Sequence, residues 1–304
     1  MPLRLGTRAS ALARWQADWV AGELRDSGND VELVPIATSG DVERGSIAQI
    51  GSQGVFTKEI QRALLDARID LAVHSLKDLP TEPVPGLHLA AVPPRAPIGD
   101  VLVCGKPSAL DGLARGAVVG TGSLRRRAQL LYARPDLKIK DLRGNVDTRL
   151  AKLDTGQYDA VVLAEAGLRR LGLEQRITHV LPPSIMLPAV GQGALGLEAR
   201  ADDRETRAAI ASLNDESSFR AVAAERSMLA ALKGGCLAPI AAWGRVVHDE
   251  LVLVGRVISP DGTRKLETEM AGPPTDAETL GRTVAEALES QGAVDLIMAA
   301  RQSG

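Results

Sequence analysis

Hydrophobic residues in the first two thirds of the chain form short apolar runs that alternate with longer stretches of helical spacing. The runs that predict strands, several with the turn that follows, are 3–6, 31–38, 69–75, 116–123, 139–145, 158–167 and 187–200. Helical spacing covers 9–26, 57–67, 124–133 and 146–153. Strands and helices that alternate in this way are typical of parallel α/β units.

The last third of the chain has a different pattern. A helix expected over 217–232 ends at a glycine pair, and three apolar runs follow, divided by "HDE" and "SPDG". This order predicts an antiparallel meander, which a helix over about 275–290 would close. Prolines crowd 80–97, where we expect a crossing between domains.

The sequence therefore predicts two α/β lobes and a small C-terminal α+β domain with an antiparallel three-stranded sheet. The expected boundaries are 1–97 with 194–213 for the first lobe, 98–193 for the second, and 214–304 for the C-terminal domain.

Composition fits a globular protein of several domains, with 304 residues of which 45% are hydrophobic. No apolar stretch reaches the roughly 18 residues of a membrane span, and no signal peptide is visible at the start. Cys104 and Cys236 are the only cysteines, too few for a disulfide framework and without zinc-ligand spacing. We expect a cytoplasmic protein without a bound metal.

The arginines are unevenly distributed along a chain whose net charge is −2. There are 28 arginines and only 8 lysines, and base composition alone could account for this ratio if they were scattered. However, 121–149 holds six arginines and two lysines against three aspartates, a local balance of +5. Arginine suits two-pronged recognition of carboxylate or phosphate, so this segment is expected to bind an anion.

Polar turns follow several of the predicted strands, where open α/β sheets collect their ligands. The turns are 7–10, 75–78, 121–126 and 143–149. Ser10 and Ser123 could each be a simple helix N-cap. Together the turns predict a cleft between the lobes for a ligand with several carboxylates or phosphates.

Single residues in these turns have a structural and a functional interpretation. Asp78 could cap local N–H groups or pair with Lys77, but in a basic setting it could also stabilise a cation formed on a substrate. His74 is expected to be a strand residue that faces the sheet. By residue chemistry alone, Cys236 is a small apolar filler.

Seven segments, in this order along the chain, resemble the porphobilinogen deaminase (hydroxymethylbilane synthase) family. They are "GTRAS", "AVHSLKDLPT", "GTGSLRRRAQL", "LRGNVDTRLAKLD", "YDAVVLAEAGLRRLGL", "LPAVGQGALGLEAR" and "LKGGCLAPI". The resemblance implies two α/β lobes like those of periplasmic anion-binding proteins, and a C-terminal domain that carries the cofactor cysteine.

The resemblance also implies an activity. Such a transferase of porphyrin (tetrapyrrole, haem) biosynthesis joins four porphobilinogen molecules head to tail, releases four ammonia molecules and gives hydroxymethylbilane. Its dipyrromethane cofactor is built from two substrate molecules and attached by a thioether to the cysteine that matches Cys236. The family expectation is a monomer with neither nucleic acid nor membrane as a partner.

The family's site residues match positions of this chain. Asp78 matches the catalytic aspartate, which hydrogen-bonds pyrrole N–H groups and stabilises the cationic azafulvene. The expected cofactor-binding residues are Cys236, Lys77, Ser123, Arg125, Arg126, Arg143 and Gly144. The expected substrate-binding residues are Arg8, Ser10, Phe56, Arg149, Arg170 and Gln192. Gln49 and Gln53 depart from the lysines of many members and are not assigned to the site.

Two other classes of protein were weighed against this enzyme. A non-catalytic two-lobed binding protein for a small polycarboxylate would explain the arginines but not Cys236. A nucleic-acid binder is disfavoured because aromatic residues make up only 2% and the net charge is negative.

Overall fold

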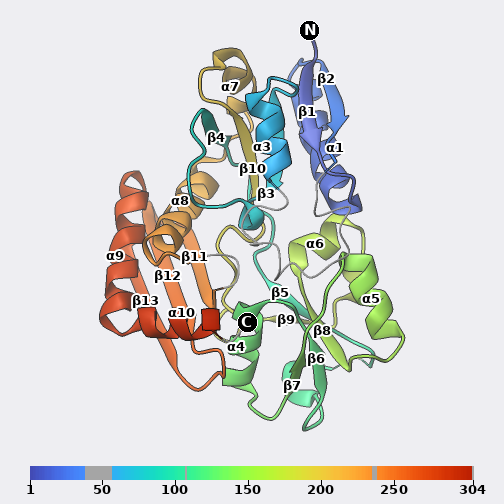
Figure 1. The fold of residues 1–304 in the computed structure, drawn as a ribbon, viewed down its shortest axis with the longest axis vertical. Helices are drawn as coiled ribbons and strands as arrows, with labels where there is room; N and C mark the ends of the chain where they lie inside the picture. The colour runs from blue at the N-terminus through green and yellow to red at the C-terminus, as the bar shows by residue number, and fades with distance from the viewer. Residues whose placement is uncertain (38–56, 107, 235–237, 303–304) are drawn as a thin grey trace. The chain divides into compact units, whose positions relative to one another are not determined.

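The structure is a computed structural model, and it describes residues 1–37, 57–106, 108–234 and 238–302. The chain forms two compact units (Figure 1). The first is Met1–Ala96 with Ala194–Phe219, and the second is Pro97–Gly193 with Arg220–Gly304. Within the described ranges, no helix is long and apolar enough to cross a membrane. The finer division into three domains stays a prediction.

The first unit is built on a five-stranded sheet of order β2-β1-β3-β10-β4. Its strands are β1 (Leu3–Thr7), β2 (Val31–Pro35), β3 (Leu71–Ser75), β4 (Leu87–Ala91) and β10 (Leu195–Arg200). β1 runs parallel to β2 and β3, whereas β10 is antiparallel to both β3 and β4.

Helices cover both faces of this sheet. α1 (Ala11–Asp26) and α7 (Arg204–Ala211) share one core cluster, to which Val20, Leu24 and Ile210 contribute. α3 (Lys58–Leu65) buries Ile60 and Leu64 in a separate cluster with residues of β3. The buried positions of α1 follow helical spacing, so one stripe of the helix faces the sheet.

The second unit contains another five-stranded sheet, of order β7-β6-β8-β5-β9. Its strands are β5 (Asp100–Cys104), β6 (Val118–Gly120), β7 (Lys138–Lys140), β8 (Ala160–Ala164) and β9 (His179–Leu181). The cluster containing Leu130 of α4 (Leu124–Ala133) lies apart from that of α5 (Val146–Asp154) and α6 (Glu165–Arg170). The consecutive strand residues Val101 and Leu102 belong to different clusters, as expected for a sheet that is buried on both faces.

The second unit also contains an antiparallel sheet of order β11-β12-β13. Its strands are β11 (Ile240–Val247), β12 (Glu250–Ile258) and β13 (Lys265–Gly272), and its helices are α8 (Glu216–Ala231), α9 (Ala277–Ser290) and α10 (Ala293–Gln302). Leu251 and Leu253 of β12 join the core with these helices. On the opposite face, Arg256 donates a hydrogen bond to Gln129 of α4 (2.8 Å). This polar contact connects the antiparallel sheet to helix α4 of the second lobe.

The expected α/β lobes and the antiparallel three-stranded sheet are confirmed. The lobes contain parallel α/β units but their sheets are mixed, because β10 and β5 each run antiparallel to their neighbours. Leu195 begins β10 beside Ser75, the last residue of β3, and Asp100 begins β5 beside Ala164, the last residue of β8. In each lobe one strand therefore begins at the edge where its parallel neighbours end.

Candidate functional site

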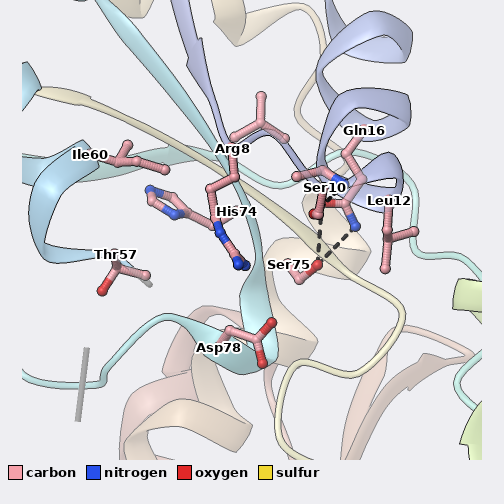
Figure 2. A pocket seen from close by; sticks show the side chains of 11 residues that line it. Arg8, Ser10, Leu12, Gln16, Thr57, Ile60, His74, Ser75 and Asp78 are labelled. Atoms are coloured by element: carbon pink, nitrogen blue, oxygen red, sulfur yellow. Dashed lines mark hydrogen bonds between the residues drawn. The ribbon is translucent and has the colours of Figure 1, made fainter. Parts of the chain in front are cut away.

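A pocket in the first unit lies where β1 and β3 end (Figure 2). Arg8 and Ser10 follow β1, and Ser75 and Asp78 lie at the end of β3. The described residues that line it are Arg8, Ser10, Leu12, Ala13, Gln16, Thr57, Ile60, Val73, His74, Ser75 and Asp78. The structure thus brings together three residues predicted from the sequence, namely Arg8, Ser10 and Asp78.

Local hydrogen bonds shape the wall of this pocket. The side chain of Ser10 caps α1, since its Oγ accepts a hydrogen bond from the backbone N–H of Ala13 (3.3 Å). Gln16 is buried and donates from Nε2 to Oγ of Ser75 (2.8 Å), joining α1 to the end of β3 (Figure 2). Ser10 is therefore an N-cap, as one interpretation of the sequence held, and it also lines the pocket.

Asp78 is an exposed carboxylate at the end of a short 3-10 helix, Leu76–Asp78, that follows β3 directly. Lys77 precedes it and is half-buried. Leu76 is buried, and its backbone N–H donates to the carbonyl of Ala194 next to β10 (3.0 Å). The short helix is thus anchored on its apolar side, and the carboxylate of Asp78 stays accessible to a ligand in the pocket.

His74 also lines the pocket, but its side chain is buried in the interior of the first unit. Its side chain is 3% exposed, and its Nε2 lies 3.0 Å from Oε2 of Glu198 in β10. Gln61 of α3 donates to Oε1 of the same carboxylate (3.0 Å). The prediction that His74 is a strand residue within the sheet is confirmed.

The second lobe holds a buried ionic cluster at the start of α4. Arg125 and Arg126 are 4% and 5% exposed, and both contact the fully buried carboxylate of Asp100. Arg125 donates from Nη1 to Oδ2 (2.7 Å), and Arg126 donates from Nε (3.0 Å) and Nη2 (2.6 Å) to Oδ1. Ser123 caps α4 by accepting from the backbone N–H of Arg126 (3.4 Å).

The charges of this cluster do not balance. Burial alone would raise the pKa of Asp100, but the two guanidinium groups outweigh it and hold that pKa well below its usual range. Burial lowers the pKa of Arg125, and Asp100 opposes this shift. One carboxylate faces two cations, and among the described residues the buried Nε–H of Arg125 has no acceptor. The cluster therefore carries an excess positive charge in the interior of the second lobe.

The turn between β7 and α5 carries Arg143 and Gly144, and α5 itself carries Arg149, which are three more of the predicted residues. Arg143 is exposed and donates to Asp141 (2.7 Å), and Arg149 donates from Nε to the carbonyl of Gly144 (2.7 Å). Gly144 has φ +114°, a conformation that favours glycine. A Cβ on Gly122 would lie 2.9 Å from the carbonyl oxygen of Leu142, so this turn lies beside the one that precedes α4.

Arg170 is the last residue of α6, and Gln192 lies in the segment that precedes β10. Arg170 donates from Nη2 to the carbonyl of Gly193 (2.8 Å), and burial lowers its pKa to about 10. Gln192 is 1% exposed and donates from Nε2 to the carbonyl of Ile98 (2.8 Å) and to Oδ1 of Asp100 (3.0 Å). Gln192 therefore connects the segment before β10 to the segment before β5 and to the buried ionic cluster.

Several predicted positions lie outside the described residues, namely Cys236, Phe56, Gln49 and Gln53. Cys104 is described and half-buried, and its Sγ contacts the carbonyl of Ser108 (3.6 Å). Burial raises the pKa of the Cys104 thiol.

Asp100 is the residue that the sequence reasoning missed. It lies 25 positions before Arg125, and only the pairing of β5 with β8 brings it to this edge of the sheet. The available signal was an aspartate directly before the apolar run "VLVC".

Several solved structures are similar to this chain at low sequence identity. The methionine-binding protein MetQ is 16% identical, with 72% of this chain and 89% of that chain covered and a TM-score of 0.46. A periplasmic substrate-binding protein of an ABC transporter from Coxiella burnetii is 16% identical (69% and 91% covered, TM-score 0.44). The periplasmic VFT2 domain of BvgS from Bordetella pertussis is 18% identical (69% and 86% covered, TM-score 0.41).

Two family models match most of the sequence. The model "Porphobilinogen deaminase, dipyromethane cofactor binding domain" matches residues 3–208. The model "Porphobilinogen deaminase, C-terminal domain" matches residues 219–290. Both the pocket of the first unit and the buried ionic cluster fall within the cofactor-binding match. The chain belongs to the porphobilinogen deaminase family.

Proposed function

We propose that this protein joins four porphobilinogen molecules head to tail, with release of four ammonia molecules, to give hydroxymethylbilane. The observation that carries the proposal is the pocket in which Arg8, Ser10 and Asp78 meet. A guanidinium group, a hydroxyl and an exposed carboxylate at the ends of adjacent strands suit a substrate that has carboxylates and a pyrrole N–H. The family match supports this choice of substrate.

The cationic residues bind and orient carboxylates in this proposal. The residues that would hold the cofactor are Lys77, Ser123, Arg125, Arg126, Arg143 and Gly144. Arg8, Ser10, Phe56, Arg149, Arg170 and Gln192 would hold the substrate and the growing chain. A dipyrromethane tethered to Cys236 supplies the primer to which the substrate units are added.

Asp78 is the proposed catalytic residue. Its carboxylate is exposed in the pocket, within a setting that includes Arg8, and it accepts hydrogen bonds from pyrrole N–H groups. Loss of ammonia from porphobilinogen leaves a positive charge on the substrate. A fixed negative charge lowers the energy of the transition state in which that charge develops.

We also propose that the protein acts as a monomer in the cytoplasm and has no nucleic-acid partner. The negative net charge supports the absence of a nucleic-acid partner, because binding to nucleic acid gains its affinity from an excess of cations.

The substitution Asp78→Asn tests the proposed role, since it keeps the shape of the side chain and removes its charge. We expect kcat to fall by about 100-fold or more, because a single preorganised electrostatic group contributes on that order. Glu82→Gln is the matched control, as Glu82 is an exposed carboxylate nearby in the sequence that does not line the pocket. Near-normal turnover in Asp78→Asn would refute the role.

A non-catalytic binding protein for a polycarboxylate is the second candidate. It would use the same arginines, but it gives Asp78 no role, because an exposed carboxylate in the pocket repels an anionic ligand. Consumption of porphobilinogen by the purified protein separates the two candidates.

A further inference from the structure

We propose that Asp100 is a positioning residue for the cofactor. It fixes the guanidinium groups of Arg125 and Arg126 and sets the positive charge that they present. The inference rests on the proposed function, in which these two arginines bind carboxylates of the dipyrromethane cofactor.

The contacts of Asp100 determine how both arginines lie. Its Oδ2 accepts from Arg125, and its Oδ1 accepts two hydrogen bonds from Arg126 and one from Gln192 (3.0 Å). The carboxylate is therefore bound on both oxygens by side chains from α4 and from the 190–193 turn. Because Asp100 is 0% exposed, water does not compete for these bonds.

Backbone carbonyls complete the arrangement of the two guanidinium groups. Arg125 Nη1 also donates to the carbonyl of Leu187 (2.6 Å), and Arg126 Nη1 donates to the carbonyl of Val162 (2.9 Å). Each arginine thus has one ionic and one neutral anchor, in different directions. Only the ionic anchor is common to both, so Asp100 sets their position relative to each other.

The charge balance gives Asp100 a second effect. With Asp100 ionised the cluster carries one excess positive charge, and the buried Nε–H of Arg125 has no acceptor among the described residues. Without this carboxylate, two like charges would be buried side by side and would repel each other. Asp100 therefore allows two arginines to remain side by side in the interior and still attract one carboxylate of the cofactor.

The place of Asp100 in the fold supports this role. Asp100 is the first residue of β5, and its four successors are the apolar run Val101–Cys104. A buried aspartate adds nothing to the apolar packing of that strand, and burying its charge is unfavourable without partners. Its charged partners are Arg125 and Arg126, which the family resemblance assigns to the cofactor, and Gln192 is its neutral partner.

The experiment compares Asp100→Asn with two control variants. Asp136→Asn removes a carboxylate of the same lobe that pairs with Arg134 (2.8 Å), away from α4's first turn. Leu130→Ala removes a fully buried side chain of α4 and lowers stability without changing a charge. Each variant is purified as a folded monodisperse protein. We then measure the fraction that carries the extra mass of two linked pyrrole units, and the thermal midpoint.

The proposal predicts that Asp100→Asn lowers the loaded fraction by roughly tenfold, because charge-paired donors contribute strongly to carboxylate binding. Leu130→Ala and Asp136→Asn should be loaded as fully as the wild type, even where the midpoint falls as far as in Asp100→Asn. Full loading of Asp100→Asn, or a proportional loss of loading in Leu130→Ala, would overturn the proposal.

A second variant covers the case in which Asp100→Asn does not fold. Asp100→Glu keeps the charge but displaces both guanidinium groups by one methylene, so we expect it to be loaded less than the wild type. Wild-type loading of Asp100→Glu would contradict a positioning role. Absence of the extra mass from active wild-type protein would contradict the proposed function itself, which separates the two failures.

Discussion

Asp70→Asn tests how the sheet that carries the pocket is held together. Asp70 precedes β3, and its carboxylate accepts from Arg4 of β1 (2.7 Å) and from Arg200 of β10 (3.1 Å). These strands also carry or border Arg8, Ser75 and Asp78 at their other ends. The ion pairs therefore connect the three central strands at the edge opposite the pocket.

The pKa of Asp70 gives the contribution of these ion pairs to the free energy of unfolding. Burial would raise this pKa, but the hydrogen bonds from Arg4 and Arg200 outweigh it and lower the pKa from 3.8 to about 2. A difference of that size corresponds to about 2.4 kcal/mol at neutral pH. Because the side chain of Arg4 is 37% exposed, solvent screening reduces this to about 1–2 kcal/mol.

The sign of the pH dependence follows from the lowered pKa. The stabilisation is complete above the unfolded-state pKa of 3.8 and is lost as the pH falls through 3.8 towards 2. Urea unfolding at pH 7, 5 and 3 should show the full difference between wild type and Asp70→Asn at pH 7 and 5. At pH 3 roughly half of it should remain.

A matched control is available in the same segment. Asp66 pairs with Arg68 at 3.7 Å, and both side chains are more than half exposed, so Asp66→Asn should leave the unfolding free energy unchanged. A difference for Asp70→Asn that stays constant from pH 7 to pH 3, or an equal effect in both variants, would refute the electrostatic account.

Two further predictions concern the second unit. Glu225 is fully buried and accepts hydrogen bonds from the backbone N–H groups of Gly191 and Gly244 (both 2.7 Å). We therefore expect Glu225→Gln to lower the free energy of unfolding, measured by chemical denaturation, by about 2 kcal/mol or more. An unchanged free energy of unfolding would contradict this prediction. In Gly281→Ala the new Cβ would lie 2.3 Å from the carbonyl oxygen of Ala224, which should cost about 1–3 kcal/mol. Gly22→Ala in α1 is the control, because the new Cβ meets no atom within 4 Å and the substitution should be neutral or stabilising. Equal shifts of the thermal midpoint in these two glycine variants would contradict the close packing of α8 and α9.

The fold was predictable wherever the apolar pattern was long and regular. The helix expected over 124–133 is α4, with the same bounds, and the three strands of the C-terminal sheet lie where the meander was expected. The apolar pattern did not indicate β4, which lies inside the proline-rich segment 80–97, or the helices α7 and α10. The pattern also did not indicate that β5 pairs antiparallel with β8 or that β10 pairs antiparallel with β3, because pairing partners far apart in sequence leave no local pattern.

The candidate site was predictable in residue type but less so in arrangement. Turns after β1, β3 and β6 carry the expected polar residues, because the carboxyl ends of parallel strands share one edge of a sheet. Arginine is usually exposed, so the burial of Arg125 and Arg126 could not be inferred from their spacing. Their partner Asp100 is brought to them only by tertiary pairing.

The intact mass of the purified protein tests the central claim most directly. If Cys236 anchors a dipyrromethane primer, the wild-type protein carries an excess equal to two linked pyrrole units, and Cys236→Ser carries none. Cys104→Ser serves as the control, because it removes the other thiol of the chain and should leave the excess in place. An unmodified mass in wild-type protein that still converts porphobilinogen would contradict the account.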